Sequence, residues 1–398
     1  METAEEIRQN ANYDESKVPA YTLPDPLLLP EGHPVTDAAT WFEKARPATY
    51  LLFETLMYGR TPDKNIPIRA EVLRTNPQAL GGKATTLQTR LYLGERSDTY
   101  MDLLTFLPNG ASGPVPLFLG LSFSGNHTVS HEPDVPVTES WVRDLPDLGQ
   151  VNHRATEATR GIGTENWQAE LLVERGYGLT TIYYGDIDPD FDDGFQNGIH
   201  PLFYAEGQTR PGPGEWGSIG AWAWGLSRAL DYLETLPAVD AKKVAVIGHS
   251  RLGKTALWAA AQDQRFALAI SNNSGSGGAA IGRRMFGETY AHLNTAFPHW
   301  FSQTFHAYSY READLPFDQH QLLALVAPRP LYVASASEDL WADPYGEYLA
   351  TEHVRPVYNL LAGEDAAKRI GYHKRPGGHD INRYDWERYL DFADANLR

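Results

Sequence analysis

The spacing of hydrophobic and polar residues changes along this chain and predicts different elements in its first part. Residues 12–34 are punctuated by prolines, which favours an extended arm, and residues 36–58 then carry apolar side chains at helical spacing. Residues 86–93 and 99–107 alternate apolar and polar positions on either side of the charged turn 94–97. This alternation predicts an antiparallel hairpin among the opening strands.

Further along, short apolar runs alternate with longer helical patterns. The segments VPLFLGLSF, GLTTIYY, KVAVIG, FALAISNNSG and PLYVASA are typical of buried strands. Helical spacing near residues 167–176, over 217–236 and after Ser250 separates several of them. Strands that alternate with helices predict an α/β fold, in which a mostly parallel sheet carries helices on both faces.

One stretch interrupts this alternation, from Arg283 to Phe317. We expect a helical insertion there, over the carboxyl ends of the strands, where open α/β sheets bind their ligands. A chain of 398 residues could hold two or three average domains, but single α/β domains often run this long. We therefore predict one catalytic domain over residues 1–398, with an N-terminal arm and helix in 1–60 and the insertion in 283–317.

Composition narrows the classes of function. Hydrophobic residues make up 42% of the chain and aromatic residues 12%, which supports a large core and excludes intrinsic disorder. The formal net charge of −17 repels phosphate backbones and anionic lipids, so we expect neither nucleic acid nor membranes as partners. No apolar run approaches the length of about 18 residues that a spanning helix needs. The absence of cysteine excludes disulfides, thiolate nucleophiles and cysteine-ligated metal centres.

A candidate nucleophile lies in VAVIGHSRLGKTALW, residues 244–258. A β-branched run, a sharp turn and a helical pattern follow one another there, which places Ser250 on a strand-to-helix turn at the top of the sheet. The helix N-terminus offers free N–H groups and a positive dipole to a developing oxyanion. The usual pattern is G-x-S-x-G, whereas here Leu252 takes the second position after the serine and Gly253 follows one later. A serine that merely caps the helix is the alternative.

A nucleophilic serine needs a base and an acid that orients the base, and in α/β-hydrolases these follow in the order Ser, Asp or Glu, His. His379 lies in the glycine-rich turn KRPGGHDIN after the last predicted strand region, so its loop can reach the serine. Asp339 follows the strand PLYVASA closely, whereas Asp343 precedes a proline and suits a turn or a helix cap. We predict an α/β-hydrolase fold, a three-layer sandwich with a catalytic triad of Ser250, His379 and Asp339. A structural role for Asp339 as a cap is the alternative.

Five segments together resemble the glucuronoyl esterases, carbohydrate esterase family 15. They are GHSRLGK, SNNSGSGGAA, the FPHWF run, the EDLWADP stretch and the GGH turn, and the resemblance covers most of the chain. The family signature G-C-S-R-x-G-K is matched except at His249, where cysteine is usual. The resemblance implies a serine carboxylesterase that needs no cofactor. It would hydrolyse esters between glucuronate or 4-O-methyl-glucuronate of xylan and lignin alcohols.

The resemblance also assigns residues to substrate binding. It places Arg251 in the oxyanion hole and Lys254, Glu288 and Trp341 around the uronate ring. Chemistry agrees, because a guanidinium beside the nucleophile can neutralise an oxyanion, a carboxylate accepts sugar hydroxyls, and an indole offers an apolar face. The alternatives are structural: an acid-paired arginine, a solvated helix lysine, an ion pair of Glu288 with Arg283 or Arg284, and a tryptophan packed under a loop.

Position 273 departs from the family pattern. Many members carry the triad acid as glutamate in S-Q-E-S-G, 23 residues after the serine, where this chain has Asn273. A neutral amide would not stabilise the imidazolium that forms when His379 takes the serine proton. The alternative acid of some bacterial members, at the end of the later strand, corresponds to Asp339.

Two further stretches invite an assignment. The segment LGLSFSGNHTV corresponds to the loop that lends a second oxyanion N–H in this fold, so we expect Asn126 and His127 to line the site. The acidic stretch DIDPDFDDG, residues 186–194, does not have the spacing of a calcium loop. We expect a solvated acidic turn there and predict no metal ion.

The N-terminus is polar and acidic, with neither the basic start nor the apolar core of a secretion signal. The resemblance nevertheless implies secretion or a periplasmic location, and a carbohydrate substrate, glucuronoxylan esters. We expect a monomer. Two other functions stay open: an acetyl xylan esterase or other serine hydrolase with the same triad, and a catalytically silent glucuronoxylan-binding protein on the hydrolase fold.

Overall fold

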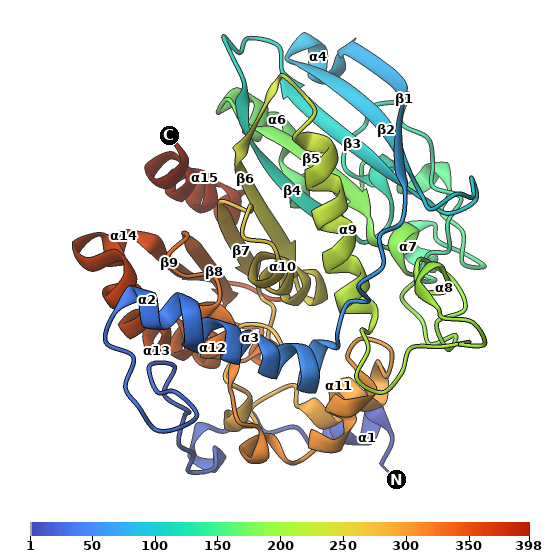
Figure 1. Ribbon diagram of the computed structural model, residues 1–398. Coiled ribbons are helices and arrows are strands. Elements are labelled where there is room, and N and C mark those ends of the chain that lie inside the picture. Colours follow the sequence, from blue (N-terminus) through green and yellow to red (C-terminus); the bar gives the residue numbers. More distant parts are fainter. Residues whose placement is uncertain (1) are drawn as a thin grey trace.

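A sheet of nine strands runs through the computed structural model, which describes residues 2–398 (Figure 1). The strands are β1 (Ile68–Gln78), β2 (Ala84–Leu93), β3 (Tyr100–Pro108), β4 (Val115–Ser122), β5 (Gly178–Tyr183), β6 (Val239–His249), β7 (Leu268–Asn272), β8 (Leu331–Ala336) and β9 (Ile370–Arg375). Their order is β1-β2-β3-β5-β4-β6-β7-β8-β9. The pairs from β1 to β5 are antiparallel and those from β5 to β9 are parallel, which confirms the predicted mostly parallel sheet with an antiparallel start.

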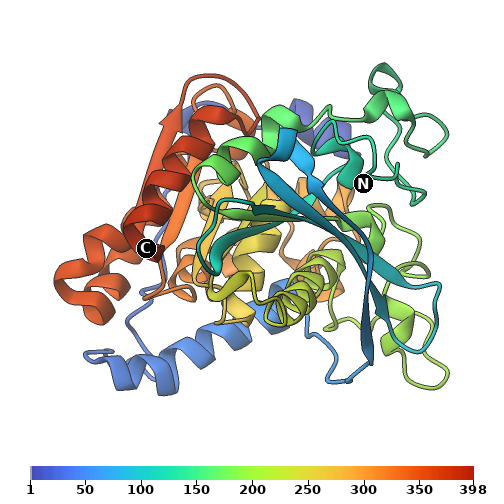
Figure 2. The same ribbon diagram turned by 90° about the horizontal axis from the view of Figure 1, so that it is seen from above.

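Helices cover both faces of this sheet (Figure 2). The α-helices are α1 (Ala4–Gln9), α2 (Ala38–Thr40), α3 (Arg46–Phe53), α4 (Ala79–Gly82), α5 (Thr164–Trp167), α6 (Ala169–Glu174), α7 (Tyr184–Ile187), α8 (His200–Phe203), α9 (Ser218–Leu233), α10 (Arg251–Gln262), α11 (Tyr290–Ala296), α12 (Gln319–Ala324), α13 (Pro344–Ala362), α14 (Ala366–Arg369) and α15 (Arg383–Leu397). No helix among residues 2–398 combines the length and the apolar character that crossing a bilayer requires.

Each central strand contributes to two cores because its side chains alternate between the two faces. In β4, Leu117 and Leu119 belong to the larger core, against α3, α9, α10, α12 and α13, whereas Phe118 belongs to the smaller core, against α6 and α15. A strand buried on both faces needs apolar residues at nearly every position. This requirement explains the continuous apolar runs in the sequence.

The N-terminal arm is part of the larger core. The chain is helical from Ala38 to Tyr58, and Tyr58 stacks on Trp258 of α10 with ring centroids 4.5 Å apart. Its hydroxyl donates to the carbonyl of Gly277, 3.0 Å away. The arm therefore packs against α10 and stabilises the position of this helix, which begins directly after Ser250.

Strand β1 was not predicted. All but one of its residues are exposed, and Val72 and Leu73 near its middle are 52% and 46% exposed. An edge strand without a buried face has no reason to alternate apolar and polar residues, so the hydrophobic pattern carries no signal for it.

Candidate active site

Ser250 occupies a strained turn between β6 and α10. Its φ and ψ are 57° and −130°, and its N–H donates to the carbonyl of Asn272 at 2.9 Å. The turn is so tight that a Cβ at Gly248 would lie 1.9 Å from the carbonyl oxygen of Leu252. Leu252 itself is buried in the larger core, and Gly253 instead supplies the second close approach, against Ser274. A glycine at position 253, one residue later than in G-x-S-x-G, is therefore compatible with the strained backbone at Ser250. Backbone strain of this kind is typical of functional sites.

The structure brings Ser250, His379 and Asp339 into one hydrogen-bonded chain. His379 Nε2 lies 2.9 Å from Ser250 Oγ, and His379 Nδ1 lies 2.6 Å from Asp339 Oδ2. Burial alone would raise the pKa of Asp339, but its hydrogen bonds from His379 and Asn273 hold it below the ordinary value. A charged Asp339 fixes the proton of His379 on Nδ1, which leaves Nε2 free to accept the serine proton.

Asn273 supports the carboxylate of Asp339. Its Nδ2 donates to the same oxygen, Asp339 Oδ2, at 2.7 Å. The amide thus stands beside the acid, in the position where the family pattern places the acid itself. Asp343, the other carboxylate of this stretch, instead caps α13 by accepting from the N–H of Gly346 and pairs with Arg284.

A buried arginine holds the loop that carries His379, and sequence reasoning missed it. The Nε of Arg375 donates to Asp385 at 2.9 Å, and its two terminal nitrogens donate to the carbonyls of Pro376, Gly378 and Asp380. Arg375 is 4% exposed. A glycine-rich loop is flexible by itself, so this clamp supplies the rigidity that a base needs. An Arg in a strand followed ten residues later by an Asp carries no recognisable spacing signal.

Arg251 lies beside the turn as a fixed cation. It pairs with Asp190, and the same carboxylate accepts from the Tyr184 hydroxyl and from the ring N–H groups of His299 and Trp300. The charge of Arg251 is the main cause that keeps the pKa of Asp190 well below its ordinary value, although burial alone would raise it. The structural alternative for Arg251, an ion pair at the helix start, is therefore present in the structure. This ion pair also fixes the position of the Arg251 guanidinium next to Ser250.

The expectation of a solvated turn over residues 186–194 was wrong for its first half. Asp188 and Asp190 are 3% and 2% exposed, and each is satisfied by buried donors, among them the ring of His200 and the hydroxyl of Ser218 for Asp188. The sequence showed the acidic cluster but not its partners, which lie on distant elements. Within residues 2–398, no group of three or more histidine and carboxylate side chains is arranged to hold a metal ion.

Lys254 and Glu288 form a buried pair on the α10 side of the serine. Lys254 Nζ lies 3.1 Å from Glu288 Oε2 and donates to the carbonyl of Ser276 at 2.7 Å. Burial lowers the pKa of Lys254, while the nearby lysine is the main cause that keeps the pKa of Glu288 below its ordinary value against the effect of burial. The solvated-lysine alternative is therefore wrong. The proposed pairing of Glu288 with Arg283 or Arg284 is also absent among the described contacts.

Trp341 lies next to this pair. Its carbonyl accepts from the N–H of Glu288 at 2.9 Å, and its ring meets the edge of His292 with centroids 4.7 Å apart. The guanidinium of Arg8, from the N-terminal helix α1, lies 5.2 Å above the same ring. The indole is half-buried and leaves part of its surface open toward solvent.

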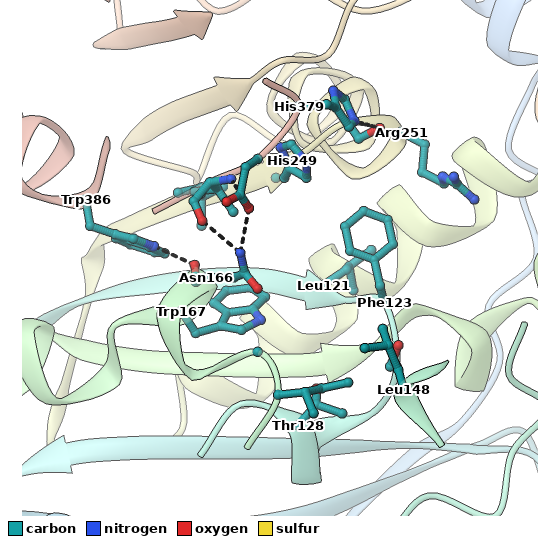
Figure 3. Close-up of a pocket in the computed structure, with 18 residues that line it drawn as sticks. Leu121, Phe123, Thr128, Leu148, Asn166, Trp167, His249, Arg251, His379 and Trp386 are labelled. Atoms are coloured by element: carbon teal, nitrogen blue, oxygen red, sulfur yellow. Dashed lines mark hydrogen bonds between the residues drawn. The ribbon is translucent and has the colours of Figure 1, made fainter. Parts of the chain in front are cut away.

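A pocket of about 390 Å³ opens beside Ser250, which is one of its lining residues (Figure 3). Loops after β4, before α5 and after β9 form its walls. Asn126 and His127, which we expected to line the site, do not line this pocket. His127 is buried against Thr159, and Asn126 bridges β3 and β5 through Asp102 and Thr181. Their neighbours Phe123 and Ser124 face the pocket instead.

Glu347 of α13 is a buried carboxyl group that contacts β8 and the loop after β7, and its ionisation should affect the stability of the protein. It accepts from Ser335 Oγ at 2.6 Å and from the N–H of Gly275 at 2.9 Å. Burial raises its pKa from the ordinary 4.5 to about 8. Between these pH values the folded protein keeps a proton that the unfolded chain releases, so stability falls as the pH rises.

Glu347→Gln keeps one acceptor oxygen, for the N–H of Gly275, turns its NH2 toward Ser335 Oγ as a protonated carboxyl would turn its O–H, and removes the titration. We expect its free energy of unfolding, relative to the unchanged protein, to increase by up to about 1.4 kcal/mol per pH unit between pH 4.5 and 8. Urea unfolding at pH 5, 6.5 and 8 measures this difference. Parallel pH profiles of the two proteins would contradict a protonated buried carboxyl group.

Comparisons with known proteins show which proteins this chain resembles. A family model described as "Glucuronyl esterase, fungi" matches residues 211–362. Carbohydrate esterase MZ0003, from an unknown prokaryotic organism, is 50% identical over 97% of this chain and 92% of its own length. A 4-O-methyl-glucuronoyl methylesterase from Hypocrea jecorina is 41% identical over 39% of this chain and 36% of its own length.

A solved structure of a glucuronoyl esterase from Solibacter usitatus superimposes with a TM-score of 0.91. It is 48% identical and covers 96% of this chain and 100% of its own. The α/β-hydrolase fold predicted from the sequence is confirmed. A fold shared over the whole length and half of all residues identical leave one assignment: this chain is a carboxylic ester hydrolase and belongs to the glucuronoyl esterases, carbohydrate esterase family 15.

Proposed function

We propose that this protein cleaves esters between glucuronate, or 4-O-methyl-glucuronate, of xylan and lignin alcohols through an acyl-enzyme on Ser250. The observation that carries the proposal is the hydrogen-bonded chain from Ser250 through His379 to Asp339 on a strained turn. Such a chain activates a hydroxyl that would otherwise be a poor nucleophile.

The reaction runs in two acyl transfers. His379 Nε2 takes the proton of Ser250 as its oxygen attacks the ester carbonyl, and Asp339 stabilises the imidazolium. The first N–H groups of α10 and the guanidinium of Arg251 stabilise the oxyanion. His379 then gives its proton to the leaving alcohol oxygen, and a water molecule, activated by the same imidazole, releases glucuronate and restores Ser250.

The acyl half of the substrate lies on the side of Lys254, Glu288 and Trp341. An ammonium has three N–H donors, and Lys254 uses two of them on Glu288 and Ser276. The third is free for a sugar oxygen. Glu288 accepts a hydroxyl donor, and the solvent-exposed part of Trp341 packs against the sugar ring.

Removal of the Lys254–Glu288 pair tests the uronate assignment. Lys254→Met with Glu288→Gln removes both charges together and leaves no unpaired buried ion. We expect kcat/KM for methyl glucuronate to fall by about 10- to 100-fold, while an acetate ester, which has no sugar ring on its acyl side, changes little. Initial rates on glucuronate, galacturonate and acetate esters measure this.

Lys242→Ala, an exposed lysine at the start of β6, is the control and should leave all three rates unchanged. If the double variant keeps its uronate rate and the unchanged protein prefers acetate, the protein is an acetyl esterase with the same triad.

We further propose that the enzyme acts as a monomer, without a cofactor, and is secreted or periplasmic, because xylan and lignin are polymers outside the cell.

A further inference from the structure

The pocket beside His379 is lined by neither Lys254 nor Glu288. Its floor includes Ile247, Ile381 and Trp386, which belong to the smaller core under α15. Lys254 instead lies over Trp300, in the larger core. Ser250 and His379 stand between the two sides, and both line the pocket.

The chemistry of the reaction indicates which half of the ester lies against the pocket and which lies against the Lys254–Glu288 pair. His379 Nε2 must reach the oxygen of the leaving alcohol, so the group attached to that oxygen extends from the histidine. The wall on that side continues through Asp380 and Ile381, the residues that follow His379. The pocket therefore adjoins the leaving group rather than the uronate.

The walls of the pocket are mostly apolar and aromatic. Leu121, Phe123, Leu148, Ile162, Trp167 and Trp386 line it, as Figure 3 shows for most of them. Phe123, Leu148 and Ile162 are between 37% and 47% exposed, so the apolar wall reaches the protein surface. A cavity of about 390 Å³ is within the ordinary range of ligand sites, about 300–1,000 Å³, and is larger than a methyl group requires.

One polar atom of the wall has no partner in the described chain. His249 Nδ1 lies 2.6 Å from Asn272 Oδ1, and Asn272 is oriented because its Nδ2 donates to the Tyr389 hydroxyl at 2.7 Å. An amide oxygen only accepts, so Nδ1 carries the proton and Nε2 is an acceptor. Burial lowers the pKa of His249 to about 3, which keeps the ring neutral. Its Nε2 makes no hydrogen bond within residues 2–398 and is not among the fully buried unpaired atoms.

We propose that this pocket is the binding site for the alcohol half of the ester, that it selects an arylmethyl alcohol, and that His249 Nε2 accepts a hydrogen bond from a hydroxyl on that alcohol. The inference rests on the proposed function and adds to it a location and a specificity-determining residue. An apolar slot favours the aromatic ring, and a partly buried acceptor without a partner favours an alcohol that carries a donor over one that does not.

A charge at the rim tests the apolar part of the proposal. Ile162→Asp introduces a carboxylate into the pocket wall, and Val151→Asp introduces the same group at an exposed position of the same loop region outside the pocket. We expect Ile162→Asp to lower the ratio of kcat/KM for benzyl over methyl glucuronate by about tenfold, and Val151→Asp to leave it unchanged. Hydrolysis of the acyl-enzyme, which no longer contains the alcohol, should proceed at the same rate in both variants.

A second variant tests the acceptor. His249→Phe keeps a ring in the wall and removes Nε2. We expect the ratio of kcat/KM for 3-hydroxybenzyl over 3-methoxybenzyl glucuronate to fall by about fivefold, with the methyl ester as the reference for any general loss. An unchanged ratio would overturn the role of His249, and an unchanged benzyl-to-methyl ratio in Ile162→Asp would overturn the alcohol site. Both results differ from failure of the proposed function, in which the unchanged protein would not hydrolyse methyl glucuronate at all.

Discussion

Ser250→Ala is expected to lower kcat/KM for methyl glucuronate by on the order of 10⁵- to 10⁶-fold, the largest loss of any single change in this protein. Without Oγ there is no atom to form the acyl-enzyme, and His379 has nothing to deprotonate except water. Initial rates with the purified protein measure the loss. A fluorophosphonate probe should add to Ser250 in the unchanged protein and should not label the variant.

Ser302→Ala is the matched control. Ser302 is buried and its hydroxyl has no partner in the part of the chain that the structure describes, so its loss should change neither rate nor labelling. An equal rate in Ser250→Ala would exclude Ser250 as the nucleophile. An unchanged protein that resists the probe but binds glucuronoxylan would instead be a catalytically silent binding protein.

The elements around Ser250 could be predicted because the signal is local. Strand, turn and helix follow one another within fifteen residues, and each has its own hydrophobic period. Asp339 could be inferred in the same way, from its position directly after a buried strand. In both cases the backbone pattern places the side chain, and no distant contact has to be known.

The supports of the site could not be predicted because they depend on contacts between distant segments. Asp190 precedes Arg251 by 61 residues, and only the folded chain brings the two together. The same holds for Arg375, whose clamp on the His379 loop depends on the start of α15. A buried charge resembles an exposed one in the sequence, so the pattern predicts a solvated turn for the acidic stretch containing Asp190, and this prediction is wrong.

Asn273 raises a further question: whether the proposed triad acid could stand at position 273 instead of position 339. Asp339 Oδ2 accepts from both His379 Nδ1 and Asn273 Nδ2, at 2.6 and 2.7 Å. The two nitrogens therefore lie no farther apart than these two bonds together allow. A glutamate at 273, one methylene longer than asparagine, has the reach to bring a carboxylate to the imidazole.

Asp339→Asn is expected to reduce kcat by about 10⁴-fold, because an amide does not stabilise the imidazolium and can hold the wrong tautomer. Adding Asn273→Glu to this variant should raise kcat at least tenfold above that of Asp339→Asn alone, since it returns one negative charge to the same histidine. Asn273→Gln with Asp339→Asn is the matched control, equal in size but uncharged, and should restore nothing. Asn273→Glu alone should lower activity at neutral pH, because two adjacent carboxylates share a proton and weaken the hydrogen bond to His379. If the glutamate and glutamine double variants are equally inactive, the acid cannot be moved, and Asp339 acts through its place on the β8 loop as much as through its charge.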